Sequence, residues 1–258
     1  MKRLLIAIMF LTRMPVATSL APGAVEVGRS AAWFPLVGAA IGALEGFIGW
    51  ALSYLVAKSG APWPDSGKAT VIAALIIGAG VFLTGALHLD GLADMADGFG
   101  GGWTREDVLR IMRDHAIGSY GAVALILVLA LKTASVSVLI TRGAALTYLI
   151  VASALSRGTM VAVGFYLPYA RPSQGGLGGS FENLRVIELT SSSALAVALS
   201  FIAGWRMAVI SVALAGLVSL GSAWYCMRRI GGITGDTLGA TSEICETVIL
   251  AVGALLPR

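Results

Sequence analysis

Seven stretches of mostly apolar residues alternate with polar segments along the chain. A helix needs about 20 predominantly apolar residues to cross the hydrocarbon core of a bilayer, and four stretches reach about this length. The two stretches beside Arg206 predict either one long tilted helix with a break or two closely spaced helices. The pattern therefore predicts an all-α, polytopic membrane bundle of about six to seven transmembrane helices, over residues 31–57, 69–87, 117–141, 144–167, 193–205, 207–225 and 244–256.

Composition supports a membrane protein. Of the 258 residues, 57% are hydrophobic and only 12% are charged, whereas a soluble domain carries about 25% charged residues. This balance favours one membrane domain over residues 1–258. The net charge of +4 suits anionic lipids and substrates but is too small to indicate nucleic-acid binding. Cys226 and Cys245 are too few for a disulfide framework.

The first residues, MKRLLIAIMFLTR, combine a basic start with a short apolar run. This pattern is typical of a weak signal peptide or of a short helix at the membrane surface. Arg13, Met14 and Pro15 follow directly, where a cleavage site would need small residues. We therefore expect a surface or re-entrant helix that stays on the protein.

The distribution of basic residues predicts the orientation, because cytoplasmic segments carry an excess of Lys and Arg. With the N-terminus inside, eleven basic residues lie inside and five outside. This favours a cytoplasmic N-terminus and cytoplasm-facing active-site loops at 88–116, 168–192 and 226–242. The inside residues are Lys2, Arg3, Arg13, Arg29, Arg105, Arg110, Arg113, Arg171, Arg185, Arg228 and Arg229, and the outside ones are Lys58, Lys68, Arg142, Arg206 and Arg258.

Three aspartates stand close together in the segment HLDGLADMADGFGGG, residues 88–102. On a helix, the spacing of Asp90, Asp94 and Asp97 places them in one stripe. Two unit charges ~4 Å apart repel by roughly 4 kcal/mol at an effective dielectric of 20, and no lysine interrupts the stripe. Mg²⁺ prefers oxygen ligands and keeps positions for waters and phosphates. The stripe therefore predicts a magnesium–phosphate site rather than a solvated helix end, and Gly91 and Gly98 would let a large ligand approach the backbone.

The next segment, TREDVLRIMRDH, predicts a short helix capped by Thr104. Arg110 and Arg113 are either clamps for phosphate or charges that only set the topology. His88 and His115 are candidates for proton transfer, although a histidine at a membrane boundary is more often a hydrogen-bonded structural residue.

A second acidic patch lies in RRIGGITGDTLGATSEICE, residues 228–246. On a helix, Asp236 and Glu243 share a face, and Glu246 follows. Carboxylates at a membrane boundary favour a functional role, so this patch could complete an acidic cavity with the first one. The alternative is that these acids only cap the last helix.

Other polar or small residues interrupt the apolar runs. Gly38, Gly42 and Gly46 recur every four residues, a spacing that lets helices approach closely in lipid. Glu45, Lys132 and Arg157 should face the bundle interior and find partners there. The glycine-rich segment LPYARPSQGGLGGSFE, which contains Arg171, lacks the Gly-Lys-Ser/Thr of a phosphate loop and is interpreted as a substrate-facing loop.

These motifs together resemble the cobalamin synthase family, the adenosylcobinamide-GDP ribazoletransferases or cobalamin-5′-phosphate synthases. The resemblance lies in HLDGLADMADG, RDHAIGSYG and RRIGGITGDTLGATSEICE, and extends to FLTRMPV, FPLVGAAIG and LPYARPSQGGLG. CDP-alcohol phosphotransferases share a D-x-x-D-G core, but the Ala-Arg that follows it there is absent here. One departure is Asp114-His115-Ala116, where the family often has Asp-Ser-Arg, and this puts a role for His115 in doubt.

The resemblance implies a Mg²⁺-dependent enzyme of the bacterial inner membrane, with its active site facing the cytoplasm. It would join adenosylcobinamide-GDP to α-ribazole or α-ribazole 5′-phosphate and release GMP. A membrane phosphotransferase with a lipid acceptor and a divalent-cation transporter are the alternatives, and a homo-oligomer is left open. The implied catalytic residues are Asp90, Asp94, Asp97 and Asp236; the implied metal ligands are these four and Glu243; the implied substrate-binding residues are Arg13, Arg110, Arg113, Asp114, Arg171 and Gly235.

Overall fold

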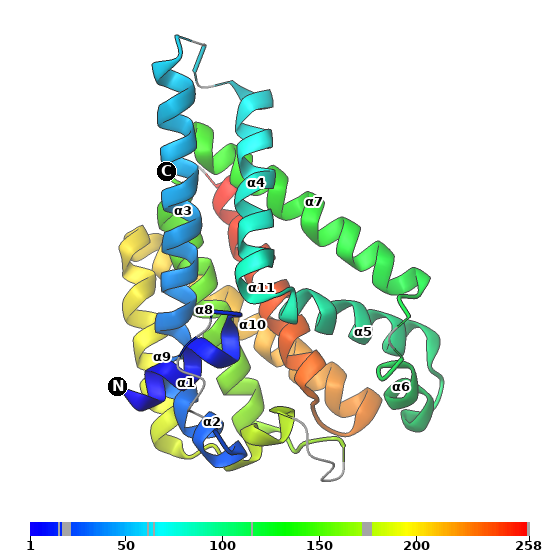
Figure 1. Cartoon of the computed structure of the whole chain (residues 1–258). Coiled ribbons are helices and arrows are strands. Elements are labelled where there is room, and N and C mark those ends of the chain that lie inside the picture. Colours follow the sequence, from blue (N-terminus) through cyan, green and yellow to red (C-terminus); the bar gives the residue numbers. More distant parts are fainter. Residues whose placement is uncertain are drawn as a thin grey trace.

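The computed structural model describes residues 1–14, 16, 22–60, 62–63, 65–114, 116–171 and 177–256. This part of the chain is built from helices (Figure 1). The helices are α1 (Lys2–Leu11), α2 (Ala24–Ser30), η1 (Ala31–Trp33), α3 (Phe34–Lys58), α4 (Ser66–Thr84), α5 (Leu87–Gly101), α6 (Arg105–Ile111), α7 (Ser119–Thr141), α8 (Ala145–Tyr166), η2 (Leu177–Asn183), α9 (Val186–Ser200), η3 (Phe201–Ala203), α10 (Trp205–Ile230) and α11 (Gly235–Leu255).

Seven helical segments among the described residues are long and apolar enough to cross a membrane, which confirms the predicted polytopic bundle. They comprise α2–α3, α4, α7, α8, α9–η3, α10 and α11. The ambiguous pair around Arg206 is a hairpin of two spans, because Gly204 takes a left-handed φ of 84° between η3 and α10. The ten-residue α1 is the short N-terminal helix predicted from the sequence.

The helices α3 and α8 pack against each other at the level of their backbones. A Cβ atom at Gly38 or Gly42 would overlap the backbone carbonyl of Ser153 or Leu149 on α8. A Cβ atom at Gly46 would lie 2.6 Å from the Cα of Leu146 on α8. The regularly spaced glycines therefore serve the close helix packing that their spacing predicts.

Two segments predicted as cytoplasm-facing loops are largely helical. In 88–116, the helix that the aspartate spacing predicts is α5, which runs across the bundle beyond the end of α4, and the predicted short helix after Thr104 is α6 (Figure 1). The last span begins at Gly235 rather than at residue 244. Most of the predicted loop 226–242 is therefore helical, and only residues 231–234 separate α10 from α11.

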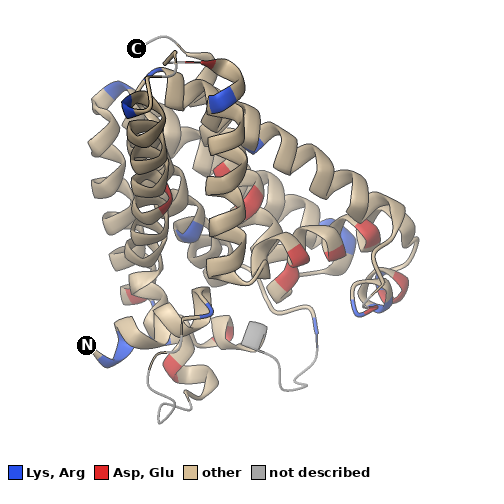
Figure 2. Cartoon of the chain, turned by 45° about the horizontal axis from the view of Figure 1, so that its top comes forward, with Lys and Arg blue, Asp and Glu red and all other residues tan. Residues whose placement is uncertain are grey.

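The segments predicted to contain the active site lie on one side of the bundle. The N-terminal ends of α3, α7, α9 and α11 lie on the same side as the C-terminal ends of α4, α8 and α10, and α5 and α6 lie there too (Figure 1). Acidic residues mark α5 and α6 on this side (Figure 2). We call this side the aspartate end.

Candidate active site

The aspartate stripe is positioned by a sharp corner between α4 and α5. Gly85 and Ala86 both have left-handed backbones, with φ of 63° and 59°. Ala86 is the only described non-glycine residue with positive φ, a conformation that costs free energy when a Cβ is present. Arg13 lies at this corner, because its amide donates to the Leu83 carbonyl at 2.8 Å and a Cβ at Gly85 would overlap its side chain.

The helices α5 and α11 touch at the level of their backbones. A Cβ added to Gly91 would lie 2.6 Å from the carbonyl oxygen of Asp236, and one added to Gly239 would lie 3.2 Å from the Cα of His88. From the sequence, Gly91 is expected to leave room for a large ligand near the backbone, but in the structure α11 occupies this space. As a result, the glycine crossing brings Asp236 to the stripe that contains Asp90 and Asp94.

Asp94 lies at the centre of the negative charge. Burial raises the pKa of its carboxyl group to about 6, and the nearby charges of Asp236, Asp90 and Asp97 act in the same direction, while Arg171 opposes them. Like charges that share a site disfavour full ionisation. The two acidic patches therefore form one electrostatic unit, as the sequence predicted for Asp236.

Arg171 is the cation in this unit. Its guanidinium donates to Asp236 Oδ2 at 2.9 Å and, at 3.4 Å, to the carbonyl of Met112. Thr234 also donates a hydrogen bond to Asp236 Oδ2, at 3.3 Å. Gly235, the exposed first residue of α11, lies directly beside this ion pair.

A short backbone pairing fixes the position of Arg171. The amide of Ala170 donates to the carbonyl of Ile233 at 2.7 Å, and the amide of Ile233 donates to Pro168 at 2.9 Å. Gly232 lies so close to the Pro168 carbonyl that a side chain there would overlap it. The segment after α8 is thereby joined to the start of α11.

Asp97 has a structural partner that the sequence did not reveal. Its two carboxylate oxygens accept hydrogen bonds from the amides of Gly118 at 2.8 Å and Gly121 at 2.9 Å, at the start of α7. These amides belong to the first turn of α7, which has no internal partners for them. Asp97 therefore anchors α7 to α5, and each oxygen retains a lone pair for a further ligand.

The outer substrate-binding candidates are exposed. Arg110 forms a local ion pair with Asp107 at 3.4 Å, and Arg113 lies exposed after α6. Asp114 accepts a hydrogen bond from the amide of Ala116 at 3.1 Å. The predicted cap is confirmed, because Thr104 accepts from the amide of Asp107. His115 and residues 172–176 lie outside the described residues.

Two arginines that the sequence indicated only as topology charges hold the site together. Arg105 donates to the carbonyls of Ile230 and Ala170, both at 2.8 Å. Arg229 donates to the carbonyls of Phe99 and Gly102, both at 2.7 Å. No local pattern marks such partners, since each bond joins segments at least 65 positions apart.

The structure does not bring Glu243 to the aspartates. Glu243 is two helical turns deeper on α11 than Asp236, and its Oε2 accepts from Lys132 Nζ at 2.6 Å. Lys132 also bonds Glu246 at 2.7 Å, and Glu246 pairs with Arg157. This confirms the prediction that Lys132 and Arg157 face the bundle interior and find partners there. We leave Glu243 out of the metal site because Lys132 already compensates its charge.

His88 is buried between α5 and α11, and neither ring nitrogen has a hydrogen-bond partner among the described residues. Burial lowers the pKa of His88 to about 3, and the charge of Arg157 acts in the same direction. The imidazole is therefore neutral at physiological pH. This environment does not suit a general acid.

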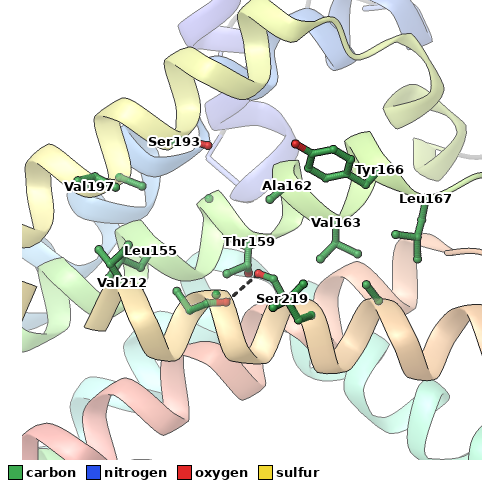
Figure 3. Close-up of a pocket in the computed structure, with 16 residues that line it drawn as sticks. Leu155, Thr159, Ala162, Val163, Tyr166, Leu167, Ser193, Val197, Val212 and Ser219 are labelled. Carbon is green, nitrogen blue, oxygen red and sulfur yellow. Dashed lines mark hydrogen bonds between the residues drawn. The ribbon is translucent and has the colours of Figure 1, made fainter. Parts of the chain in front are cut away.

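The aspartate site is distinct from an apolar groove between α8, α9 and α10 (Figure 3). The groove has a volume of about 420 Å³ and is lined by side chains such as Leu155, Val197 and Val212. Its lining contains hydroxyl groups but no charged residue. The groove therefore offers nothing to bind a metal or a phosphate.

Among the described residues, no three His, Cys, Asp or Glu side chains are already arranged as metal ligands. Asp97 is engaged with α7, and Asp236 with Arg171. Asp90 is exposed and Asp94 is half-buried, so both carboxylates are open to a ligand. The available donors are all carboxylate oxygens, the type that Mg²⁺ prefers.

Comparison with known proteins gives consistent matches over nearly the whole chain. A family model described as cobalamin-5-phosphate synthase matches residues 3–254. Curated proteins named adenosylcobinamide-GDP ribazoletransferase are similar to this chain. The relative from Chlorobaculum parvum is 40% identical, with 98% of this chain and 94% of the relative covered. The relative from Ralstonia nicotianae is 38% identical, with 97% and 94% covered, and that from Pseudomonas putida is 39% identical, with 95% of each covered. No solved structure matches the chain.

Proposed function

The chain belongs to the cobalamin-5-phosphate synthase family and has the activity of an adenosylcobinamide-GDP ribazoletransferase, and we propose that it performs this reaction where α5 crosses α11. The observation that supports this location is the convergence of Asp94 and Asp236 at Gly91. This places carboxylates from two helices together at one end of the bundle, where a metal-bound diphosphate could be held.

The reaction joins adenosylcobinamide-GDP to α-ribazole or its 5′-phosphate. A ribose hydroxyl oxygen of the acceptor forms a bond to the phosphorus that carries cobinamide. The bond from this phosphorus to the bridging oxygen breaks, GMP leaves, and the hydroxyl proton passes to a base. Transfers of this kind need mainly positioning and charge neutralisation from the protein.

We assign the positioning to residues from both helices. Asp90, Asp94 and Asp236 would hold Mg²⁺, which when bound would neutralise the charge of the diphosphate. Arg171 compensates Asp236 in the structure, and its fork of donors suits a phosphate equally well. Asp97 keeps the start of α7 against α5 and adds one further ligand position. Arg110 and Arg113 remain candidates for outer phosphate contacts.

The experiment that tests this function is GMP release from adenosylcobinamide-GDP by the purified protein. We expect release only when α-ribazole or its phosphate and Mg²⁺ are both present, and none in excess EDTA. Release that follows the addition of a phospholipid acceptor instead would indicate a lipid phosphotransferase. Turnover that persists in excess EDTA would contradict the proposed metal site.

We further propose that the aspartate end faces the cytoplasm of a bacterial inner membrane, because the described basic residues predicted to lie inside gather there. Trp103 is exposed at this end and Ser59 is exposed at the opposite end. In intact cells, a membrane-impermeant thiol reagent should label Ser59→Cys but not Trp103→Cys. Inverted vesicles should reverse the pattern, and labelling of Trp103→Cys in intact cells would overturn the orientation.

The raised pKa of Asp94 predicts how metal use depends on pH. Its carboxyl is largely neutral below about 6 and charged above it, and a proton must leave before the group can bind a cation. The Mg²⁺ concentration for half-maximal activity should therefore rise by about tenfold per unit as the pH falls below about 6. The charged form is the costly one, so the metal-free protein should lose stability as pH rises through this value.

Magnesium titrations of GMP release across this pH range measure the effect. Asp107→Asn serves as a control, because Asp107 is an exposed carboxylate outside the site. A half-saturating Mg²⁺ concentration that does not change across the range would contradict the role of Asp94.

A further inference from the structure

A second group of ionisable side chains lies inside the bundle, near the middle of the membrane-spanning helices. Lys132 on α7 donates to Glu243 at 2.6 Å and to Glu246 at 2.7 Å, both on α11. Arg157 on α8 pairs with Glu246. Two buried cations thereby compensate two buried carboxylates, so these four groups have no net charge when all are ionised, although Arg157 Nε has no hydrogen-bond partner among the described residues.

Glu45 on α3 is the carboxylate that remains. Its side chain is buried, with an exposed fraction of 6%, and Oε2 has no hydrogen-bond partner among the described residues. The carboxylate lies against Gly80 of α4, where any Cβ would overlap it. With all five groups ionised, the cluster has a net charge of −1. An isolated buried carboxylate is strongly unfavourable.

A small cavity opens beside Glu45. Its volume is about 20 Å³, and Gly80, Thr84, Lys132 and Arg157 also line it. A cavity of roughly 10–15 Å³ already holds one water-sized occupant. The Thr84 hydroxyl donates to the Gly80 carbonyl at 2.9 Å, which leaves its oxygen lone pairs free for another contact.

We propose that this cavity is a binding site for a single monovalent cation, Na⁺, held by the Glu45 carboxylate. One positive charge brings the cluster to neutrality, whereas a divalent cation would leave an excess of +1. The oxygen donors of Glu45 and Thr84 suit a hard cation, and the concentrated charge of a carboxylate binds the smaller Na⁺ more strongly than the larger K⁺. The site lies within the spans, separate from the aspartates, so it does not depend on the proposed transfer mechanism.

Thermal unfolding of the full chain in nanodiscs tests the site, followed by tryptophan fluorescence without Mg²⁺. We compare NaCl, KCl and choline chloride at equal ionic strength. The midpoint should rise saturably with Na⁺, by at least about 2–4 °C relative to choline, and less with K⁺. Equal midpoints in NaCl and choline chloride would overturn the proposal, as would a K⁺ effect equal to that of Na⁺.

Three variants assign the effect to Glu45. Glu45→Gln removes the charge at nearly constant size and should abolish the Na⁺ dependence. Gly80→Ala displaces the carboxylate and should weaken it, and Glu182→Gln, at an exposed carboxylate in η2, should leave it intact. A Na⁺-dependent shift that persists in Glu45→Gln contradicts the site.

Binding of radioactive ²²Na⁺ to the wild-type protein does not depend on how the variants fold. The proposal predicts about one saturable ion per chain. Absence of saturable binding would show that Glu45 carries a proton instead, and this result would overturn the sodium site.

Discussion

Replacing Asp94 by asparagine should lower kcat for GMP release by a factor of 10² or more, the order typical of a group that acts on proton or charge in the transition state. The substitution preserves the size of the side chain but removes the charge that a metal needs. Asp94 is the aspartate on which the charges of Asp90, Asp97 and Asp236 converge. Its loss should therefore affect the reaction rather than the fold.

Single-turnover and steady-state GMP release measure this loss at saturating Mg²⁺. Asp107→Asn is the matched control, since Asp107 bonds only to Thr104 and Arg110 at the exposed surface of α6 in the described structure. The control should retain most of its activity. An Asp94→Asn protein with near wild-type turnover would remove Asp94 from the site.

The second large effect concerns stability. Lys132→Met should lower the free energy of unfolding by about 3–5 kcal/mol, because removing one partner of a buried ion pair leaves uncompensated charge. Here the charges of both Glu243 and Glu246 lose their shared cation. Denaturant unfolding in mixed micelles provides the measurement, with Lys58→Met, at an exposed lysine beyond the cluster, as the control. A difference between the two variants below about 1 kcal/mol would show that the network contributes little.

The sequence predicts the spans well because a bilayer imposes one simple requirement, a sufficiently long apolar helix. It predicts helix boundaries less accurately where the helices contain charged residues. The apolar pattern places the start of the last span at residue 244 rather than at Gly235, because Asp236 and Glu243 lower the local hydropathy. This stretch is helical because Thr234 caps the first turn and because Glu243 buries its charge against Lys132.

In the candidate site, too, some features can be predicted from the sequence and others only from the packing of the helices. The stripe of Asp90, Asp94 and Asp97 follows from helical spacing alone, so the sequence predicts it. The bond that Arg171 donates to Asp236 and the bonds that Asp97 accepts from the start of α7 join different elements of the chain. Only the packing of the helices determines them, and so no local pattern indicates that Asp97 is also an anchor or that Gly91 serves a helix crossing.

We propose that aspartates from α5 and α11 act as one site, and a double-mutant cycle tests this directly. The measurement is kcat for GMP release by the wild type, Asp94→Asn, Asp236→Asn and the double variant. Groups that act as a unit have strongly non-additive effects, so we expect the double variant to be about as slow as the slower single variant. A double variant whose defect equals the product of the two single defects would show that the two helices contribute independently, and would contradict the composite site.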